Sequence, residues 1–153
     1  MATYKGVNRT KITSEPIQAI PKGEQYGRLH VAYDEYTAAG ALALNDVIEL
    51  MTLPEGARVH EVILDSSDLG TTGTLDLGWA AGAKGLEAAN ATGFFSAVDV
   101  ATAATRVSLV SNGAQNAAGY LKKFAEEVLV QINVSAATTA GGTIRVTVLY
   151  TVD

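Results

Sequence analysis

The chain has 153 residues, of which 48% are hydrophobic and 18% are charged, a composition that excludes a disordered protein and suits one compact domain. It contains no cysteine, which excludes disulfides, thiolate nucleophiles and thiolate metal sites. No apolar run approaches the roughly 18 residues of a membrane helix, and the first eleven residues are polar, so we expect neither a membrane partner nor a signal peptide.

The net charge of −5 is unevenly divided along the chain. Residues 1–28 carry five basic and two acidic side chains, whereas residues 29–153 carry six basic and fourteen acidic ones. The first 22 residues lack periodicity and contain two prolines, which favour extended backbone before them. We therefore predict an extended N-terminal arm over residues 1–25 and a body over residues 26–153. Nucleic acid is a weak candidate partner for the arm, because no aromatic residues are interleaved with its basic ones. Docking onto an acidic protein surface fits the arm at least as well as nucleic acid does, so we predict no nucleic acid partner.

Alternating apolar and polar residues predict β-strands throughout the body. The strand at 57–65 has apolar residues on both faces and is expected to be buried on both sides. The last two strands flank a Gly-rich turn at 140–142 and are predicted to form a long antiparallel hairpin. The expected strands cover residues 28–34, 46–52, 57–65, 74–80, 94–100, 105–110, 128–134 and 144–152.

Residues 81–92 are rich in Ala and Gly and predict a long loop, with a short helix over 84–90 as the alternative. About eight strands without a convincing helix predict an all-β fold. We expect an antiparallel β-sandwich or jelly-roll-like single domain that carries the extended N-terminal arm.

An enzyme needs a constellation of reactive side chains, and the sequence offers none. His30 and His60 stand in separate strands outside any metal-binding pattern, so we expect surface or interface positions for them. Asp65, Asp68 and Asp76 surround a loop rich in Ser and Thr that offers oxygen ligands for calcium. Their spacing matches no EF-hand, and turn formation explains them without an ion. We predict no catalysis, no metal and no cofactor.

Three other residues are singled out by their positions in the strand pattern. Trp79 alternates with leucines in its strand, which predicts a place in the core and not on a ligand platform. Glu126 and Glu127 precede a strand and are expected to be solvated gatekeepers.

Residues 46–79 read DVIELMTLPEGARVHEVILDSSDLGTTGTLDLGW. This succession of strands and turns resembles a segment of small virion proteins of tailed bacteriophages, in particular capsid decoration (cement) proteins with jelly-roll-like folds. The resemblance implies a structural protein on the outer surface of the capsid, assembled in the host cytoplasm and without a cofactor. It also implies a homo-oligomer, with a trimer favoured, that binds the major capsid protein and clamps adjacent capsomers. An N-terminal arm in such proteins often adds to a neighbouring subunit.

The arm is accordingly expected to make the contact with the capsid or with a neighbouring copy, its charges outside and its isoleucines docked. The residues of this hypothesis are Lys5, Arg9, Lys11, Ile12, Ile17 and Ile20. Three alternatives stay open. The chain could be another virion component, namely a tail, head-fibre or minor capsid protein. It could be a carbohydrate-binding β-sandwich module, which needs aromatics aligned on one face, or a cupin-like enzyme, which needs a third metal ligand beside its two histidines.

Overall fold

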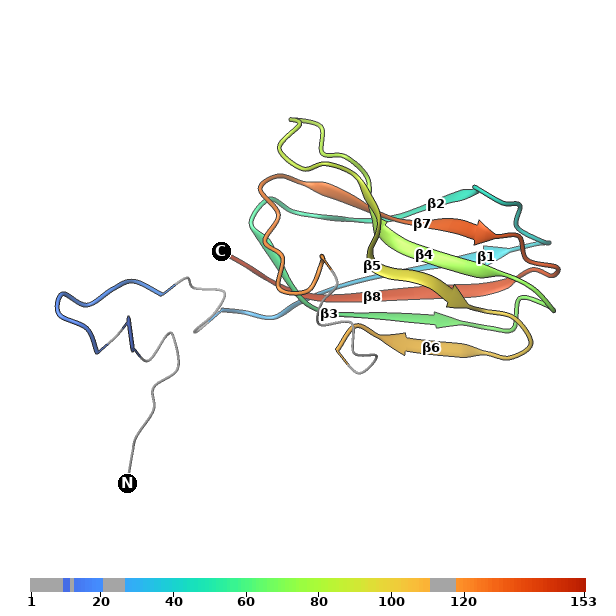
Figure 1. Cartoon of the computed structure of the whole chain (residues 1–153), viewed down its shortest axis with the longest axis horizontal. Helices are drawn as coiled ribbons and strands as arrows, with labels where there is room; N and C mark the ends of the chain where they lie inside the picture. Colours follow the sequence, from blue (N-terminus) through green and yellow to red (C-terminus); the bar gives the residue numbers. More distant parts are fainter. Residues whose placement is uncertain (1–9, 12, 21–26, 111–117) are drawn as a thin grey trace, which may run out of the picture.

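The computed structural model describes residues 10, 11, 13–20, 27–110 and 118–153. Within these residues, eight strands form two four-stranded antiparallel sheets that pack face to face (Figure 1). Sheet I has the strand order β1-β8-β3-β6 and sheet II the order β2-β7-β4-β5. The strands are β1 His30–Ala38, β2 Val47–Leu53, β3 Ala57–Ser66, β4 Thr74–Trp79, β5 Asn90–Asp99, β6 Thr105–Ser108, β7 Val128–Ala136 and β8 Gly142–Val152. The predicted antiparallel β-sandwich is confirmed.

The strands pair from the two ends of the chain inward: β1 with β8, β2 with β7, β3 with β6 and β4 with β5. The chain is therefore one long hairpin that has been rolled into two sheets, which is the arrangement of an eight-stranded jelly roll. Residues 80–89 connect β4 to β5 and form the tip of this rolled hairpin, as the predicted loop at 81–92 anticipated except for its last three residues.

The predicted hairpin of the last two strands is wrong. β7 lies in sheet II and β8 lies in sheet I, and residues 137–141 cross from one sheet to the other. The buried Val and Ile side chains of both strands line the core from opposite sides, so each strand alternates as it would in a hairpin. Periodicity identifies the buried face of a strand, but it does not identify the neighbouring strand.

The strand β3 is buried on one face, and not on both as predicted. Its register against β8 shifts between Val59 and Glu61, where one extra residue forms a β-bulge. The bulge moves the inward positions by one residue, so that Val59 and Val62 both point into the core and are fully buried. Ile63 consequently points outward and is half-buried.

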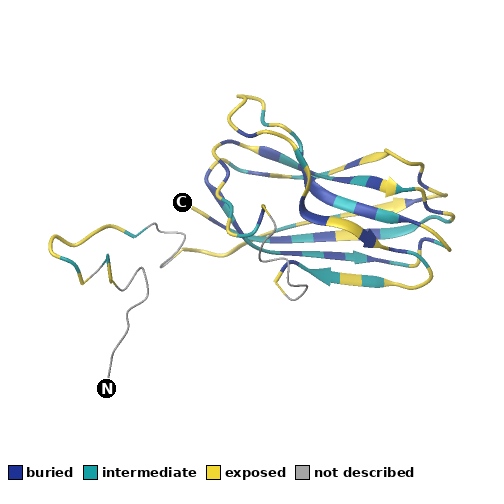
Figure 2. Cartoon of the chain, viewed as in Figure 1, coloured by how far each residue is buried: buried dark blue, intermediate teal, exposed yellow. Residues whose placement is uncertain are grey.

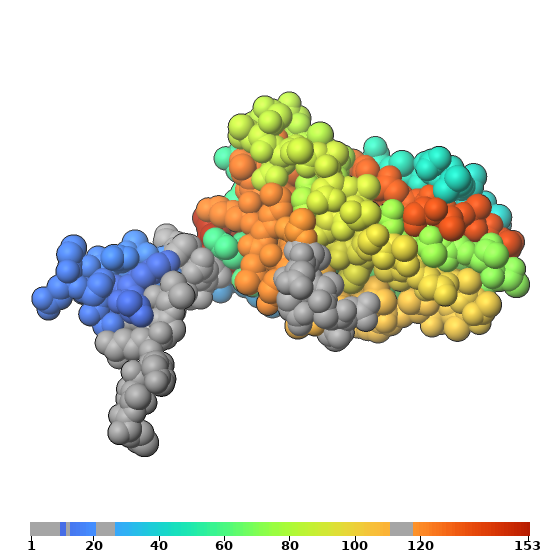
Figure 3. Space-filling view, in the orientation of Figure 1, coloured from blue at the N-terminus to red at the C-terminus, as the bar shows by residue number. Residues whose placement is uncertain are grey.

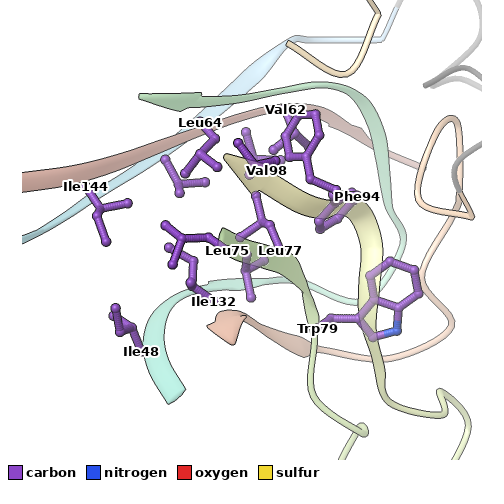
Figure 4. Packing of buried hydrophobic residues seen from close by; sticks show 14 of the residues in the cluster. Ile48, Val62, Leu64, Leu75, Leu77, Trp79, Phe94, Val98, Ile132 and Ile144 are labelled. Atoms are coloured by element: carbon purple, nitrogen blue, oxygen red, sulfur yellow. The ribbon is translucent and has the colours of Figure 1, made fainter. Parts of the chain in front are cut away.

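The core fills the space between the two sheets, and Figure 4 shows its aliphatic side chains meeting there from both sides. Trp79 lies at one end of this core and is 3% exposed. Its ring packs edge-on against Phe94 and Phe124, with centroids 5.2 and 5.1 Å away. Its Nε1–H donates to the carbonyl of Ala88 at 3.0 Å, so the predicted core position is confirmed.

The two ends of the sandwich carry different segments. His30 pairs with Tyr150, so the start of β1 lies beside the end of β8, at the end where Figure 1 places the arm and the C-terminus. The loop 80–89 projects at this same end (Figure 1). The opposite end is formed by the loops 39–46, 67–73, 100–104 and 137–141.

Candidate assembly surfaces

The residues considered for metal binding have other partners. Asp65 pairs with Arg106 at 3.1 Å, Asp68 accepts the N–H of the residue two positions later at 2.8 Å, and Asp76 accepts a backbone N–H of β5 at 2.6 Å. Among the described residues, no group of three His, Cys, Asp or Glu side chains is placed to hold a metal ion. The three aspartates therefore act as structural residues of separate turns and strands.

The two histidines contact the last strand of the chain. His30 stacks on Tyr150 with ring centroids 5.5 Å apart, and His60 Nε2 lies 2.9 Å from the hydroxyl of Thr151. These contacts give both side chains a structural role at the arm end of sheet I. No helix in the described part of the chain is long and apolar enough to cross a membrane.

The predicted contact residues of the arm are only partly covered by the structure, since Lys5, Arg9 and Ile12 lie outside the described residues. Residues 13–20 include a turn, in which the carbonyl of Lys11 accepts N–H groups at 3.4 and 3.1 Å. Ile17 is 75% exposed. Figure 1 shows this segment to one side of the sandwich.

The outer face of sheet I carries large apolar side chains in contact with solvent. Because alternate residues of β8 point into the core, Thr147 and Leu149 point outward. The register places Tyr33 of β1 beside Thr147 and Val31 beside Leu149 on this face. Val31 and Tyr33 are 62% and 56% exposed (Figure 2 maps the burial along each strand). These adjacent exposed apolar residues make the outer face of sheet I a candidate interaction surface.

A row of four charged side chains crosses the same face at one level of the sheet. It consists of Glu35 on β1, Arg145 on β8, Asp65 on β3 and Arg106 on β6, and we call it the charge row. Arg145 is ion-paired with Glu35 and Arg106 with Asp65, so the sign of the charge alternates along the row. Hydrogen bonds from Arg145 and then Tyr33 hold the pKa of Glu35 below its ordinary value.

Glu61, which pairs with Leu149, lies beside these apolar positions and is hydrogen-bonded to residues of its own sheet and of the segment that follows β6. The carboxylate of Glu61 accepts the N–H groups of Val62 and Val110 at 3.0 and 3.2 Å and the hydroxyl of Ser108 at 3.0 Å. The level of the sheet between Glu61 and the charge row holds Tyr33, Thr147, Ile63 and Ser108, none of which is charged. The outer face thus has an uncharged band beside a charged one.

The strand β1 also offers an edge. It pairs with β8 over nine residues, from His30 to Ala38, without a register shift, and it is the terminal strand of sheet I. Long regular edges favour pairing with another chain. The edge and the outer face meet at Val31 and Tyr33, so a partner can contact both.

A second feature at the arm end is a loop fixed by buried carboxylates. Glu126 is 1% exposed and accepts the backbone N–H groups of Lys84, Leu86 and Glu87 at 2.6, 2.6 and 2.8 Å. Glu87 in turn accepts the N–H of Ala125 at 2.8 Å. We call Glu126 and Glu87 the carboxylate clasp, because each holds the segment that carries the other.

The clasp favours ionised carboxylates. Burial raises the pKa of Glu126, but the N–H groups of Lys84, Glu87 and Leu86 outweigh it and leave the pKa below its ordinary value. Burial likewise raises the pKa of Glu87, and the ion pair with Lys122 together with the N–H of Ala125 lowers it to a net value below the ordinary one. The loop tip that the clasp supports carries Leu86, which is 62% exposed, and Figure 3 shows the loop as a protrusion.

The prediction of a solvated pair at Glu126 and Glu127 is therefore wrong for Glu126, whereas Glu127 is exposed. The signal for the buried position was present in the sequence. Val128 and Val130 point inward, and the same alternation continued backwards places Glu126 on the core side and Glu127 on the solvent side.

No protein-family model and no curated protein sequence matches the chain. Two solved structures contain chains that are similar to it in fold and in sequence. One is the capsid of Ralstonia phage GP4, matched with a TM-score of 0.65 and 28% identity over 83% of this chain and 86% of that one. The other is the capsid asymmetric unit of cyanophage Pam1, matched with a TM-score of 0.65 and 25% identity over 92% of this chain and 97% of that one.

Each match covers most of both chains, so the similarity extends over the jelly roll as a whole and is not limited to a shared motif. The matched chains are also about as long as this one, which makes them small subunits. The chain is thus similar, over 83% and 92% of its length, to small subunits found in the capsids of two phages.

Proposed function

We propose that this chain is a structural virion protein that binds the outer surface of a bacteriophage capsid and stabilises the contacts between capsomers, without catalysis. The observation that carries the proposal is the similarity, over nearly the whole chain, to subunits of two phage capsids. Because a jelly roll also occurs in lectins and enzymes, the fold alone would not carry it.

The surface of the body supports a role in assembly. The outer face of sheet I exposes apolar side chains beside a regular strand edge, a combination that a protein acting alone has no need to maintain. Alignment of tyrosines for a sugar is not supported by the described part of the chain, since Tyr33 points outward and Tyr36 pairs with the inward-facing Ile144.

In this proposal the partner is the major capsid protein and the arm makes the contact. Its basic residues, which include Lys5, Arg9 and Lys11, face an acidic surface, and Ile12, Ile17 and Ile20 dock in apolar positions. An extended segment that adds a strand to a partner's sheet gains affinity from main-chain pairing as well as from side chains. A trimer at three-fold positions is part of the proposal.

Co-sedimentation tests the proposal directly. Purified protein is mixed with expanded capsids of the encoding phage that lack it, and the bound protein is quantified against the capsid protein. Saturation at a fixed ratio, near one copy per capsid subunit, is the expected result. A folded protein that does not bind would contradict the proposal and would favour a tail or head-fibre component, which is present in few copies per virion.

A further inference from the structure

The charge row on the outer face of sheet I is complementary to itself. Across the four strands it reads Glu35, Arg145, Asp65 and Arg106, so its signs are negative, positive, negative, positive. Read in reverse, the signs become positive, negative, positive, negative. A second copy that presents its row in the opposite direction therefore places every charge against its opposite.

A single symmetry operation produces this reversal. The two-fold axis lies outside the outer face of sheet I, runs parallel to the strands and passes over the middle of the sheet, between β8 and β3. Rotation about this axis places sheet I of the second copy face to face with sheet I of the first and keeps each level of the sheet at the same height. Arg145 of one copy then faces Asp65 of the second copy, and Glu35 faces Arg106. A two-fold contact of this kind is isologous, with the same patch used by both copies.

The same operation covers the uncharged band. At its level Thr147 faces Ile63 of the second copy and Tyr33 faces Ser108, which removes the exposed ring of Tyr33 from water. One level further from the charge row, Leu149 faces Glu61 of the second copy, whose carboxylate is already occupied by hydrogen bonds. At this level Val31 faces the residues that follow β6, where Val110 donates its N–H to Glu61. The Glu61 carboxylate that the contact covers keeps its three hydrogen-bond donors, which belong to its own chain.

We propose that the outer face of sheet I binds a second copy of this chain through a two-fold contact centred between β8 and β3. The charge pattern identifies the occupant. A partner surface with charges of one sign would repel half of the row, whereas a reversed copy of the row repels none of it. This contact goes beyond the proposed function, since it requires no capsid. If the chain forms a trimer through other surfaces, the two-fold contact joins neighbouring trimers.

Two charge reversals test the contact by complementation. Arg145→Glu places a new carboxylate against Asp65 of an identical copy, and Asp65→Arg places a new guanidinium against Arg145, so each variant alone repels itself. In a dimer that contains one chain of each variant, all four facing pairs are again opposite in sign, and such dimers can form in an equimolar mixture. Sedimentation velocity is expected to show the association of each variant weakened at least about tenfold, and the mixture restored to within about threefold of the wild type.

The matched control is Glu49→Arg, which makes the same change of net charge as Asp65→Arg on an exposed residue of β2, in the other sheet. It is expected to associate as the wild type does. Thermal unfolding of all three variants checks that each is folded. The proposal is overturned if the mixture sediments no faster than the separate variants, or if the wild type sediments as they do at every soluble concentration.

The absence of cysteine permits a second measurement on folded protein. Thr147→Cys and Ile63→Cys are made in separate chains, mixed and oxidised. The expected product is a disulfide-linked dimer that contains one chain of each kind, because these two positions face each other across the axis. Ile63→Cys mixed with Thr52→Cys, an exposed position on β2, is expected to give none. Equal cross-linking in both mixtures would contradict the arrangement.

Discussion

Glu126 is a single residue on which a whole loop depends. Its two carboxylate oxygens accept three backbone N–H groups, and Gly82 lies so close that an added Cβ would come within 2.0 Å of the carboxyl group. A buried carboxylate is costly to desolvate unless its hydrogen bonds compensate. Here the donors come from the loop itself, so the conformation of the loop and the ionisation of Glu126 depend on each other.

Glu126→Gln is expected to destabilise the protein and to loosen the loop 80–89. The amide keeps one acceptor oxygen, but its NH₂ group confronts a backbone N–H that then has no acceptor. We expect the unfolding temperature to fall by about 4 °C or more, followed through the fluorescence of Trp79. Amide exchange of Lys84 and Leu86 should accelerate as well. Glu127→Gln, at the exposed neighbouring position, is the control, and an equal effect of both substitutions would contradict the role of the clasp.

Acid is expected to weaken the same clasp. Glu126 and Glu87 both have a pKa below the ordinary value in the folded protein. Their contribution is therefore fully present above the unfolded pKa of about 4.3 and is lost as the pH falls through the folded values. Urea midpoints measured from pH 7 to pH 3 should decrease, and the decrease should be smaller in Glu126→Gln. The same decrease in both proteins would show that other carboxylates cause it.

At the scale of one element, β4 shows how closely two strands can approach. Its register against β5 shifts on both sides of Leu77, and this brings the backbone of β5 against Gly78. A Cβ at Gly78 would lie 1.9 Å from the carbonyl oxygen of Asn90, a backbone atom that cannot move aside. Glycine is therefore required here to allow the close approach of the two strands.

Gly78→Ala is expected to lower the free energy of unfolding by about 3 kcal/mol or more, because β4 and β5 must separate to admit the methyl group. Gly40→Ala is the matched control, since a Cβ there meets no atom within 4 Å. Urea denaturation of both variants measures the difference. A Gly78→Ala variant as stable as Gly40→Ala would mean that the strands are further apart than the structure shows.

The strand bounds show what a sequence pattern can and cannot predict. Residues 57–65 and 74–80 were predicted as strands to within one residue. An apolar run between two turns marks the first strand, and the alternation of Leu75, Leu77 and Trp79 marks the second. The start of β5 was predicted four residues too late, since Asn90 to Gly93 show no alternation. They pair with the end of β4, and Gly93 lies against the ring of Trp79, where a Cβ would lie 2.0 Å from the indole. Such a tertiary cause leaves no local signal.

The candidate surface was even less accessible to prediction. Glu35 and Arg145 are 110 positions apart in the chain and become neighbours only through the register of β1 on β8. The sequence indicated the arm as the contact and did not point to this face. Once β8 is known to pair with β1 and β3, the charge row follows from the register alone.

At the scale of the whole molecule, the arm and the sandwich have separable roles in the proposed function. Deleting residues 1–22 is expected to abolish capsid binding and to leave the body folded, because the core lies wholly between the two sheets. Co-sedimentation measures the binding, and the unfolding temperature of the truncated protein serves as the control. Capsid binding at the wild-type ratio by the truncated protein would contradict the role of the arm.

The rolled-hairpin topology also gives the molecule two distinct ends to which other polypeptides could be attached. Pairing the first strand with the last puts the arm and the C-terminus at one end, and the loop 39–46 lies at the other (Figure 1). In the proposed function, a cargo fused after Asp153 would therefore be held beside the arm, against the particle. In the same proposal, a peptide inserted at Gly40, where the surroundings are open, would be displayed away from the particle, in as many copies as the particle binds.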